Sequence, residues 1–188
     1  LFPGKPLVLF AEREFSRAAK GGLGHAKTSA NYAHQYLPNW RAKEAGCDAV
    51  LWLDAETHER IEEASTMNIF MVIGGELVTP SLQDTILPGI TRRSVITLAR
   101  ERHGLKVVER PITLTEVAEA IEDGTLTEAF TASTALQIRS IARIVDRERN
   151  IDFPQETPWM DRLRRDLDAI QRGEADDEWG WITEVPVL

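Results

Sequence analysis

Apolar residues along this chain fall into short runs that predict strands, separated by amphipathic segments that predict helices. Continuous apolar runs of about four to eight residues, bounded by glycine, proline or charged residues, are typical of buried strands. The arginines in the last of these runs favour an edge position for that strand, because an edge faces solvent. The predicted strands cover residues 6–11, 49–53, 67–73, 76–79, 105–109, 128–132 and 138–145.

One hairpin and two helices are predicted from residues that favour turns or helix ends. The paired glycines at 74–75 predict a tight turn, because glycine readily adopts positive φ angles. Residues 91–103 carry apolar side chains at helical spacing, and Gly104 follows as a stop signal. Thr113, with Glu116 three residues later, forms a capping box that opens a helix to about residue 122.

The C-terminal part predicts a further helix, and a short one is expected near the start. Thr157 and Pro158 open an amphipathic segment that runs to residue 171, since proline is tolerated in the first helical turn. A short helical patch is expected after the first strand, up to residue 18. Residues 174–188 carry tryptophans and are expected to dock on the domain.

These elements predict an α+β fold with a mixed, barrel-like sheet flanked by helices. Strands and helices do not alternate strictly, which argues against a doubly wound parallel sheet. The chain has 188 residues, of which 43% are hydrophobic, so it is long enough for one sizeable core. A single domain over residues 1–188 is therefore expected.

Composition narrows the classes of partner. The net charge of -8 argues against nucleic acid or an anionic membrane surface as a partner. No apolar run approaches the roughly 20 residues that span a bilayer, and the first residues do not form a signal peptide. The single cysteine, Cys47, excludes an internal disulfide and fits a reducing compartment, so a cytoplasmic protein is expected. The four histidines are scattered without ligand spacing, and no metal site is expected.

The segment Gly-Gly-Leu-Gly-His-Ala-Lys-Thr at 21–28 carries the strongest candidate for chemistry. Its glycines allow the backbone to bend and to approach a ligand closely. Lys27, if partly desolvated there, loses basicity and becomes suited to covalent chemistry with a carbonyl compound. Tyr32 follows five residues later.

Two alternatives remain open for this segment. The first is an ordinary surface lysine in a flexible loop. The second is a nucleotide-binding P-loop, whose template places glycine where this chain has Ala26. A P-loop also follows directly on a buried strand, whereas the residues before Gly21 are charged.

Two further motifs follow the lysine in order. They are Glu-Ala-Ser-Thr-Met-Asn-Ile-Phe at 63–70 and Ile-Leu-Pro-Gly-Ile-Thr-Arg at 86–92. With these three motifs, the chain resembles the branched-chain amino acid aminotransferases, pyridoxal-phosphate enzymes of fold type IV. The resemblance runs from about residue 6 almost to the C-terminus. It implies the C-terminal, cofactor-binding domain of that fold, and the family's small N-terminal domain has no counterpart in the chain.

The resemblance also implies a role for each candidate residue. Lys27 would form the Schiff base with pyridoxal 5'-phosphate, Glu63 would pair with its pyridine nitrogen, and Tyr32 would lie near its phenolic oxygen. On a strand, Glu62 and Glu63 point to opposite faces, so only one can serve, and the family register selects Glu63. The remaining assignments are phosphate binding by the amides of Ile90 and Thr91 and by Thr134, and substrate contact by Thr66 and Ala135.

The implied reaction moves an amino group between a branched-chain L-amino acid (leucine, isoleucine or valine) and 2-oxoglutarate. A homodimer is expected by the same resemblance. Two alternatives stay open: a non-catalytic or truncated domain that dimerises or binds a partner, and a related enzyme such as a D-amino-acid aminotransferase or an aminodeoxychorismate lyase.

Overall fold

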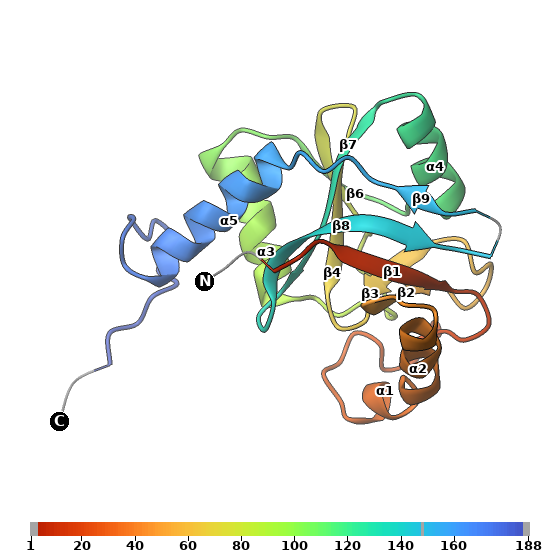
Figure 1. Ribbon diagram of the computed structural model, residues 1–188. Helices are drawn as coiled ribbons and strands as arrows, with labels where there is room; N and C mark the ends of the chain where they lie inside the picture. Colours follow the sequence, from red (N-terminus) through yellow and green to blue (C-terminus); the bar gives the residue numbers. More distant parts are fainter. Residues whose placement is uncertain (1–3, 148, 186–188) are drawn as a thin grey trace.

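The computed structural model describes residues 4–147 and 149–185. In this part of the chain, nine strands form one mixed sheet that curls into a half-barrel, with helices packed on both faces (Figure 1). The strand order is β3-β2-β1-β8-β7-β4-β5-β6, and β9 pairs with β8. The α+β fold with a barrel-like sheet, predicted from the sequence, is confirmed.

The strands are short, and most lie where the apolar runs predicted them. They are β1 (Leu7–Glu12), β2 (Ala49–Leu53), β3 (Ile61–Ala64), β4 (Asn68–Ile73), β5 (Glu76–Thr79), β6 (Val107–Glu109), β7 (Leu126–Ser133), β8 (Gln137–Val145) and β9 (Ile151–Asp152). The helices are α1 (Ala30–Ala33), α2 (Tyr36–Glu44), α3 (Ile90–Thr97), α4 (Leu114–Glu122) and α5 (Pro158–Gln171), and α3 continues as one π-helical turn, Leu98–Arg102.

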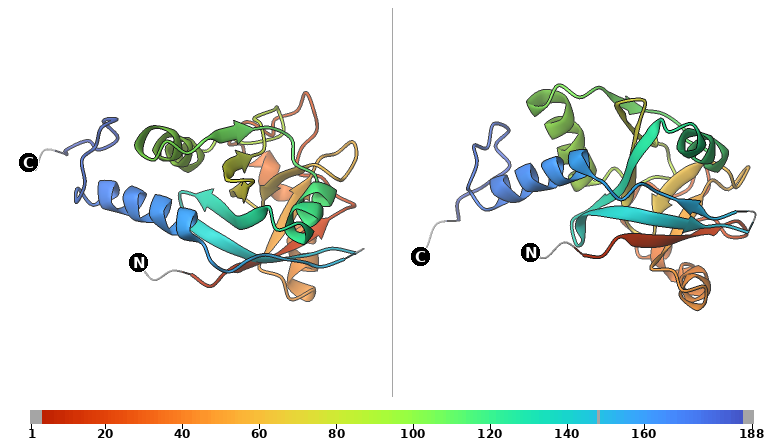
Figure 2. Two further views of the ribbon diagram at one scale, coloured as in Figure 1. Left: turned by 90° about the horizontal axis from the view of Figure 1, so that it is seen from above. Right: turned by 45° about the horizontal axis from the view of Figure 1, so that its top comes forward.

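Alternate residues of the strands face two separate cores, as the period of a strand requires. Ile69 and Met71 of β4 lie in the core inside the half-barrel, which α4 covers. Phe70 and Val72 of the same strand face the other side, where α3 and α5 pack over them (Figure 2). A third cluster on β2 is covered by α2 through Ala42.

Strand β8 joins the two parts of the sheet, which corrects the prediction of an edge strand. Its first half pairs with β7 and its second half with β1 and β9. Ile138, Ile141 and Ile144 are buried, whereas Arg143 is exposed. The Arg143 Nε donates to Asp152 of β9 at 2.6 Å. Arg143 therefore lies on the solvent-facing side of a central strand, whereas Arg139 is half-buried.

The helical patch expected up to residue 18 is wrong, because residues 13–18 form bends and loops. The Glu12 carboxylate accepts from the backbone N–H groups of Glu14 and Phe15 at 2.8 and 3.3 Å. Such local bonds from a side chain to the backbone compete with helix formation. The segment is also held by the buried side chain of Arg17.

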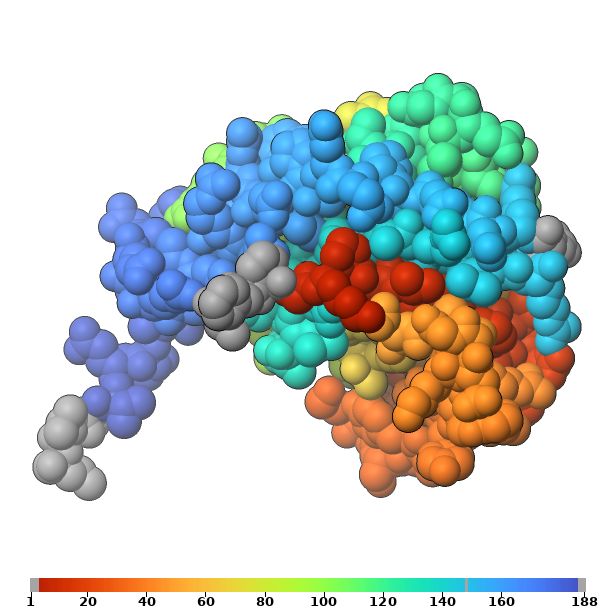
Figure 3. All heavy atoms as spheres, in the orientation of Figure 1, coloured from red at the N-terminus to blue at the C-terminus, as the bar shows by residue number. Residues whose placement is uncertain are grey.

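Helices α1 and α2 follow the lysine loop and were not predicted from the sequence. Residues 20–44, in orange, form a lobe that stands out from the body of the domain (Figure 3). Large side chains of α2 face solvent, namely Tyr36, Leu37 and Trp40. Pro38 and Ala42 are buried on the other side of α2, so its apolar residues are spread around the helix and give no amphipathic pattern in the sequence.

The C-terminal tail docks as expected through Trp179 and Trp181, whereas residues 182–185 are exposed. Trp179 and Trp181 stack at a centroid distance of 4.7 Å and pack against the core under α3 and α5. The last three residues of the expected docking segment lie outside the described residues. Across residues 4–147 and 149–185, no helix is long and apolar enough to cross a membrane.

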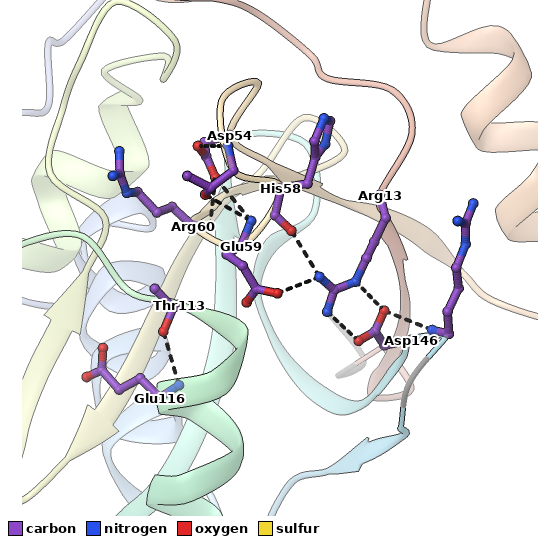
Figure 4. Close-up of polar contacts among 10 residues, drawn as sticks. Arg13, Asp54, His58, Glu59, Arg60, Thr113, Glu116 and Asp146 are labelled. Atoms are coloured by element: carbon purple, nitrogen blue, oxygen red, sulfur yellow. Dashed lines mark hydrogen bonds and ion pairs between the residues drawn. The ribbon is translucent and has the colours of Figure 1, made fainter.

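The turn between β2 and β3 is organised by the buried Asp54 (Figure 4). Its carboxylate accepts from the hydroxyl and N–H of Thr57 and from the N–H groups of Glu59 and Arg60, at 2.7 to 3.2 Å. Burial alone would raise the pKa of Asp54, but these hydrogen bonds lower it to about 2. The same turn is tied to the end of β8 by Arg13, which binds Glu59 and Asp146.

We expect Asp54→Asn to lower the free energy of unfolding by about 2 kcal/mol at pH 7, because charged acceptors of several N–H groups contribute on this scale. The folded pKa is depressed below the ordinary 3.8, so the stabilisation is present above pH 3.8 and is lost as pH falls through about 2. Urea unfolding of both proteins at several pH values measures the difference. A difference that stays constant down to pH 2 would contradict this role.

Candidate functional site

A cavity of about 320 Å³ opens between the lysine loop, the turn before α3 and the end of β7. Five of the residues predicted for the site line it together, although they come from four separate segments of the chain. These residues are Lys27, Thr66, Ile90, Thr91 and Thr134. Tyr32 lies beside Lys27, and Glu63 lies behind the turn that forms one wall.

Lys27 and Tyr32 form a pair at the rim of the cavity. The Lys27 Nζ donates to the Tyr32 hydroxyl at 3.3 Å, and it lies 5.9 Å from the centre of the ring. Both side chains are exposed in this chain. The desolvation of Lys27 expected from the sequence is therefore wrong for the chain alone, because this side of the cavity is open.

The glycines before the lysine serve packing more than close approach to a ligand. A Cβ added at Gly24 would lie 2.6 Å from the Thr85 Cα and 2.7 Å from the Asp84 carbonyl oxygen. The His25 N–H donates to the same carbonyl at 2.8 Å. Gly21 adopts a positive φ of 77° in the turn. The glycines thus bring the lysine loop against residues 84–85.

Glu63 is buried on β3 and joins two walls of the site. Its Oε1 accepts from the Leu87 N–H at 2.8 Å, and its Oε2 lies 2.8 Å from the Arg17 Nε. Burial raises the pKa of Glu63 to about 7, although Arg17, the Leu87 N–H and the charge of Lys27 each act to lower it. A carboxyl poised near neutral pH can pair with a cation or a protonated ring nitrogen.

The neighbouring Glu62 is also buried but has a different partner. Its Oε1 accepts from the Thr85 hydroxyl at 2.5 Å, and burial raises its pKa as well. Glu63 accepts from the Leu87 N–H in the turn that lines the cavity of Lys27, whereas Thr85, the partner of Glu62, is outside that lining. Glu63 is therefore the carboxyl that faces the lysine side of the sheet.

Arg17 is a functional residue that sequence reasoning missed. It is 6% exposed, and its Nη2 donates to the carbonyl oxygens of Gly24 and Thr85 at 2.7 and 2.6 Å. Its contact with Glu63 is an ion pair without hydrogen-bond geometry at Nε. One guanidinium therefore fixes the lysine loop, residues 84–85 and the Glu63 carboxylate relative to one another. No sequence signal separates Arg17 from the other arginines of the chain.

Asn68, in the second of the three motifs, also positions the site. Its Nδ2 donates to the Leu87 carbonyl at 3.0 Å, and it lines the cavity. A Cβ added at Gly89 would lie 2.2 Å from the Asn68 Oδ1, so this contact requires glycine at 89. Asn68 thus binds the backbone carbonyl of Leu87, and Glu63 binds its backbone N–H.

The start of α3 faces the same cavity as Lys27. Gly89 precedes the helix in an extended conformation, and none of the described side chains caps the first turn. The first N–H groups of a helix then present a partial positive charge suited to a phosphate. Thr134 lies opposite, in the turn after β7. Ala135 is exposed in that turn but is outside the cavity lining.

We expect the stability of the cofactor-free protein to fall as pH rises from 4.5 through about 7, relative to Glu63→Gln. The folded pKa of Glu63 lies above its ordinary value of 4.5, so the folded state binds the extra proton in this range. The difference in unfolding free energy should change by at most about 1.4 kcal/mol per pH unit. Parallel stability curves for the two proteins would contradict the raised pKa.

Arg17→Gln should destabilise the protein by about 3 kcal/mol, because it leaves a buried carboxyl without its cation. It should also raise the pKa of Glu63 further. Adding Glu63→Gln to the Arg17 variant should recover part of the loss, which a double-mutant cycle measures directly. Arg93→Gln, at an exposed position, is the matched control. Additive effects of the two changes would show that the pair is not coupled.

Comparison with known proteins gives the family. A model of the family Amino-transferase class IV matches residues 5–144. Branched-chain-amino-acid aminotransferase 2 of Bacillus subtilis (strain 168) is 44% identical over 186 residues, which is 98% of this chain and 51% of that protein. The chain thus spans about half the length of the curated relatives it matches.

Solved structures agree with the fold. The branched-chain amino acid aminotransferase from Thermobaculum terrenum, solved in its PLP form, is 30% identical with a TM-score of 0.76, covering 90% of this chain and 52% of that one. The enzyme from Thermoproteus uzoniensis with norvaline is 28% identical with a TM-score of 0.80, covering 95% and 55%. The family resemblance predicted from the three motifs is confirmed, and the chain belongs to the class IV aminotransferases.

Proposed function

We propose that this chain forms the cofactor-binding domain of a pyridoxal-phosphate aminotransferase that acts on branched-chain L-amino acids. The observation that carries the proposal is the single cavity that brings Lys27 to the start of α3, with the buried Glu63 behind the turn between them. The names of the relatives support the substrate class.

The donor set fits this cofactor at three points. The Lys27 amine lies at one side of the cavity. The N–H groups at the start of α3 and the Thr134 hydroxyl lie at another side. The buried Glu63 carboxyl lies behind the turn that forms one wall. When bound, pyridoxal phosphate supplies an aldehyde that takes up the amino group and a ring that accepts electrons from the substrate α-carbon. Ile90, Thr91 and Thr134 would hold its phosphate, because these residues offer N–H and hydroxyl donors at the cavity.

The side chains of this domain have separate roles in the reaction. Lys27 would hold the cofactor through its Nζ, and its free amine would carry a proton to and from the substrate α-carbon. The Glu63 carboxylate keeps a proton on the ring nitrogen, where a positive charge strengthens electron withdrawal. The Tyr32 hydroxyl orients the Lys27 amine through the contact seen at the rim. Thr66 lines the cavity and would contact the substrate, whereas contact by Ala135, which is outside the lining, stays a prediction from the family resemblance.

Several features stay predictions of this proposal. They are 2-oxoglutarate as the second substrate, a homodimer, a cytoplasmic location and the division into a cofactor-binding domain with a further domain outside this chain. The relatives are about twice as long as the matched region, which is consistent with a further domain. The exposed rim at Lys27 and Tyr32 is consistent with a site that further protein completes.

In the complete protein loaded with pyridoxal phosphate, Lys27→Ala should reduce transfer of the amino group from L-leucine to 2-oxoglutarate by about 10³-fold or more, because the proton carrier is lost. Glu63→Gln should lower kcat by about 10²-fold with a smaller effect on KM, since it acts on the chemical step. Lys20→Ala, in the exposed segment before the loop, is the matched control and should leave the rate unchanged.

Three results would contradict the proposal. Full activity in Lys27→Ala would remove the lysine from the reaction. Faster use of D-leucine than of L-leucine would place the protein with the D-amino-acid aminotransferases. A loaded wild-type protein that transfers no amino group would favour a lyase or a non-catalytic domain.

A further inference from the structure

A second cavity, of about 340 Å³, lies on the other side of the turn that precedes α3. It shares Pro88, Gly89 and Ile90 with the cavity of Lys27, so one turn separates the two. Nothing in the proposed reaction uses this second cavity. Its remaining walls come from Leu82, α3, the π-helical turn and the end of β6.

The second cavity is strongly cationic. Arg92, Arg93 and Arg100 line it, and Glu109 is the single carboxylate among its lining residues. Glu109 is shared, because its Oε2 lies 2.8 Å from the Arg92 Nη2 and its Oε1 lies 3.1 Å from the Arg100 Nη2. One negative charge against three positive charges leaves an excess of two. This excess stands out on a chain whose net charge is -8.

Arg92 shows that the donors exceed the acceptors that the described residues offer. It is 4% exposed, and its Nη2 also donates to the Pro80 carbonyl at 3.0 Å. Its Nε is buried and has no hydrogen-bond partner among the described residues. Arg93 is exposed and has no ion pair within the described part of the chain. Arg93 and Arg100 line the cavity and are exposed, so their guanidinium groups can donate to an anionic ligand there.

We propose that this cavity binds a small dianion, carried by either a phosphate monoester or a short dicarboxylate. Guanidinium groups recognise both kinds of anion through paired N–H donors. The excess of two positive charges matches a dianion better than a monoanion. Leu82 and Ile96 provide apolar walls for the carbon part of such a ligand.

Isothermal titration of the complete protein loaded with pyridoxal phosphate tests the proposal, because the loaded cofactor occupies the neighbouring phosphate site. Glycerol 3-phosphate and succinate are the two dianionic probes, and acetate is the monoanion for comparison. At least one dianion should bind saturably and about tenfold more tightly than acetate, and the stronger of the two identifies the class of anion. Arg93→Gln and Arg100→Gln should each weaken that binding by about tenfold, the effect of losing one charged hydrogen bond.

Arg165→Gln on α5 is the matched control and should leave the binding unchanged, because Arg165 is exposed and lies outside this cavity. Arg93 is exposed as well, so its variant should fold normally and keeps the test informative if Arg100→Gln is unstable. Dianion binding that is unaffected in Arg93→Gln would overturn the proposal. Equal binding of acetate, or no saturable binding of either dianion, would also overturn it.

Discussion

The geometry of this site depends on the burial of one carboxylate, that of Glu63. A carboxyl group is costly to remove from water unless it is paired and hydrogen-bonded. Its partners are the Arg17 guanidinium, which also binds the Gly24 carbonyl of the lysine loop, and the Leu87 N–H in the turn before α3. Satisfying the carboxylate therefore fixes the two segments that carry Lys27 and the phosphate-binding helix start.

Sequence reasoning predicted the elements whose signals are local. The apolar run of β2, the paired glycines between β4 and β5, and Thr113 at the start of α4 each act within a few residues, and the structure has all three. At the start of α4 the Thr113 hydroxyl accepts from the Glu116 N–H at 3.1 Å, while the Glu116 side chain binds Arg110. Lys27, Thr66, Ile90, Thr91 and Thr134 were placed in one site by family motifs, and the structure gathers them around one cavity.

The sequence missed the features that depend on contacts between distant segments. Arg17 looks like any charged residue until the fold brings Glu63 and Thr85 to it. The helix expected around it does not form, because side-chain bonds to the backbone and the burial of Arg17 outweigh local propensity. The arginines of β8 suggested an edge strand, because the sequence does not show which strands pair with β8 on its two sides.

The claim that Lys27 bears the cofactor is tested most directly by locating the bond itself. The complete protein is loaded with pyridoxal phosphate and reduced with borohydride, and its peptides are then mapped by mass spectrometry. The account predicts one pyridoxyl group per chain, attached to Lys27. A group attached instead to Lys20 or another lysine, or spread over several lysines, would contradict it.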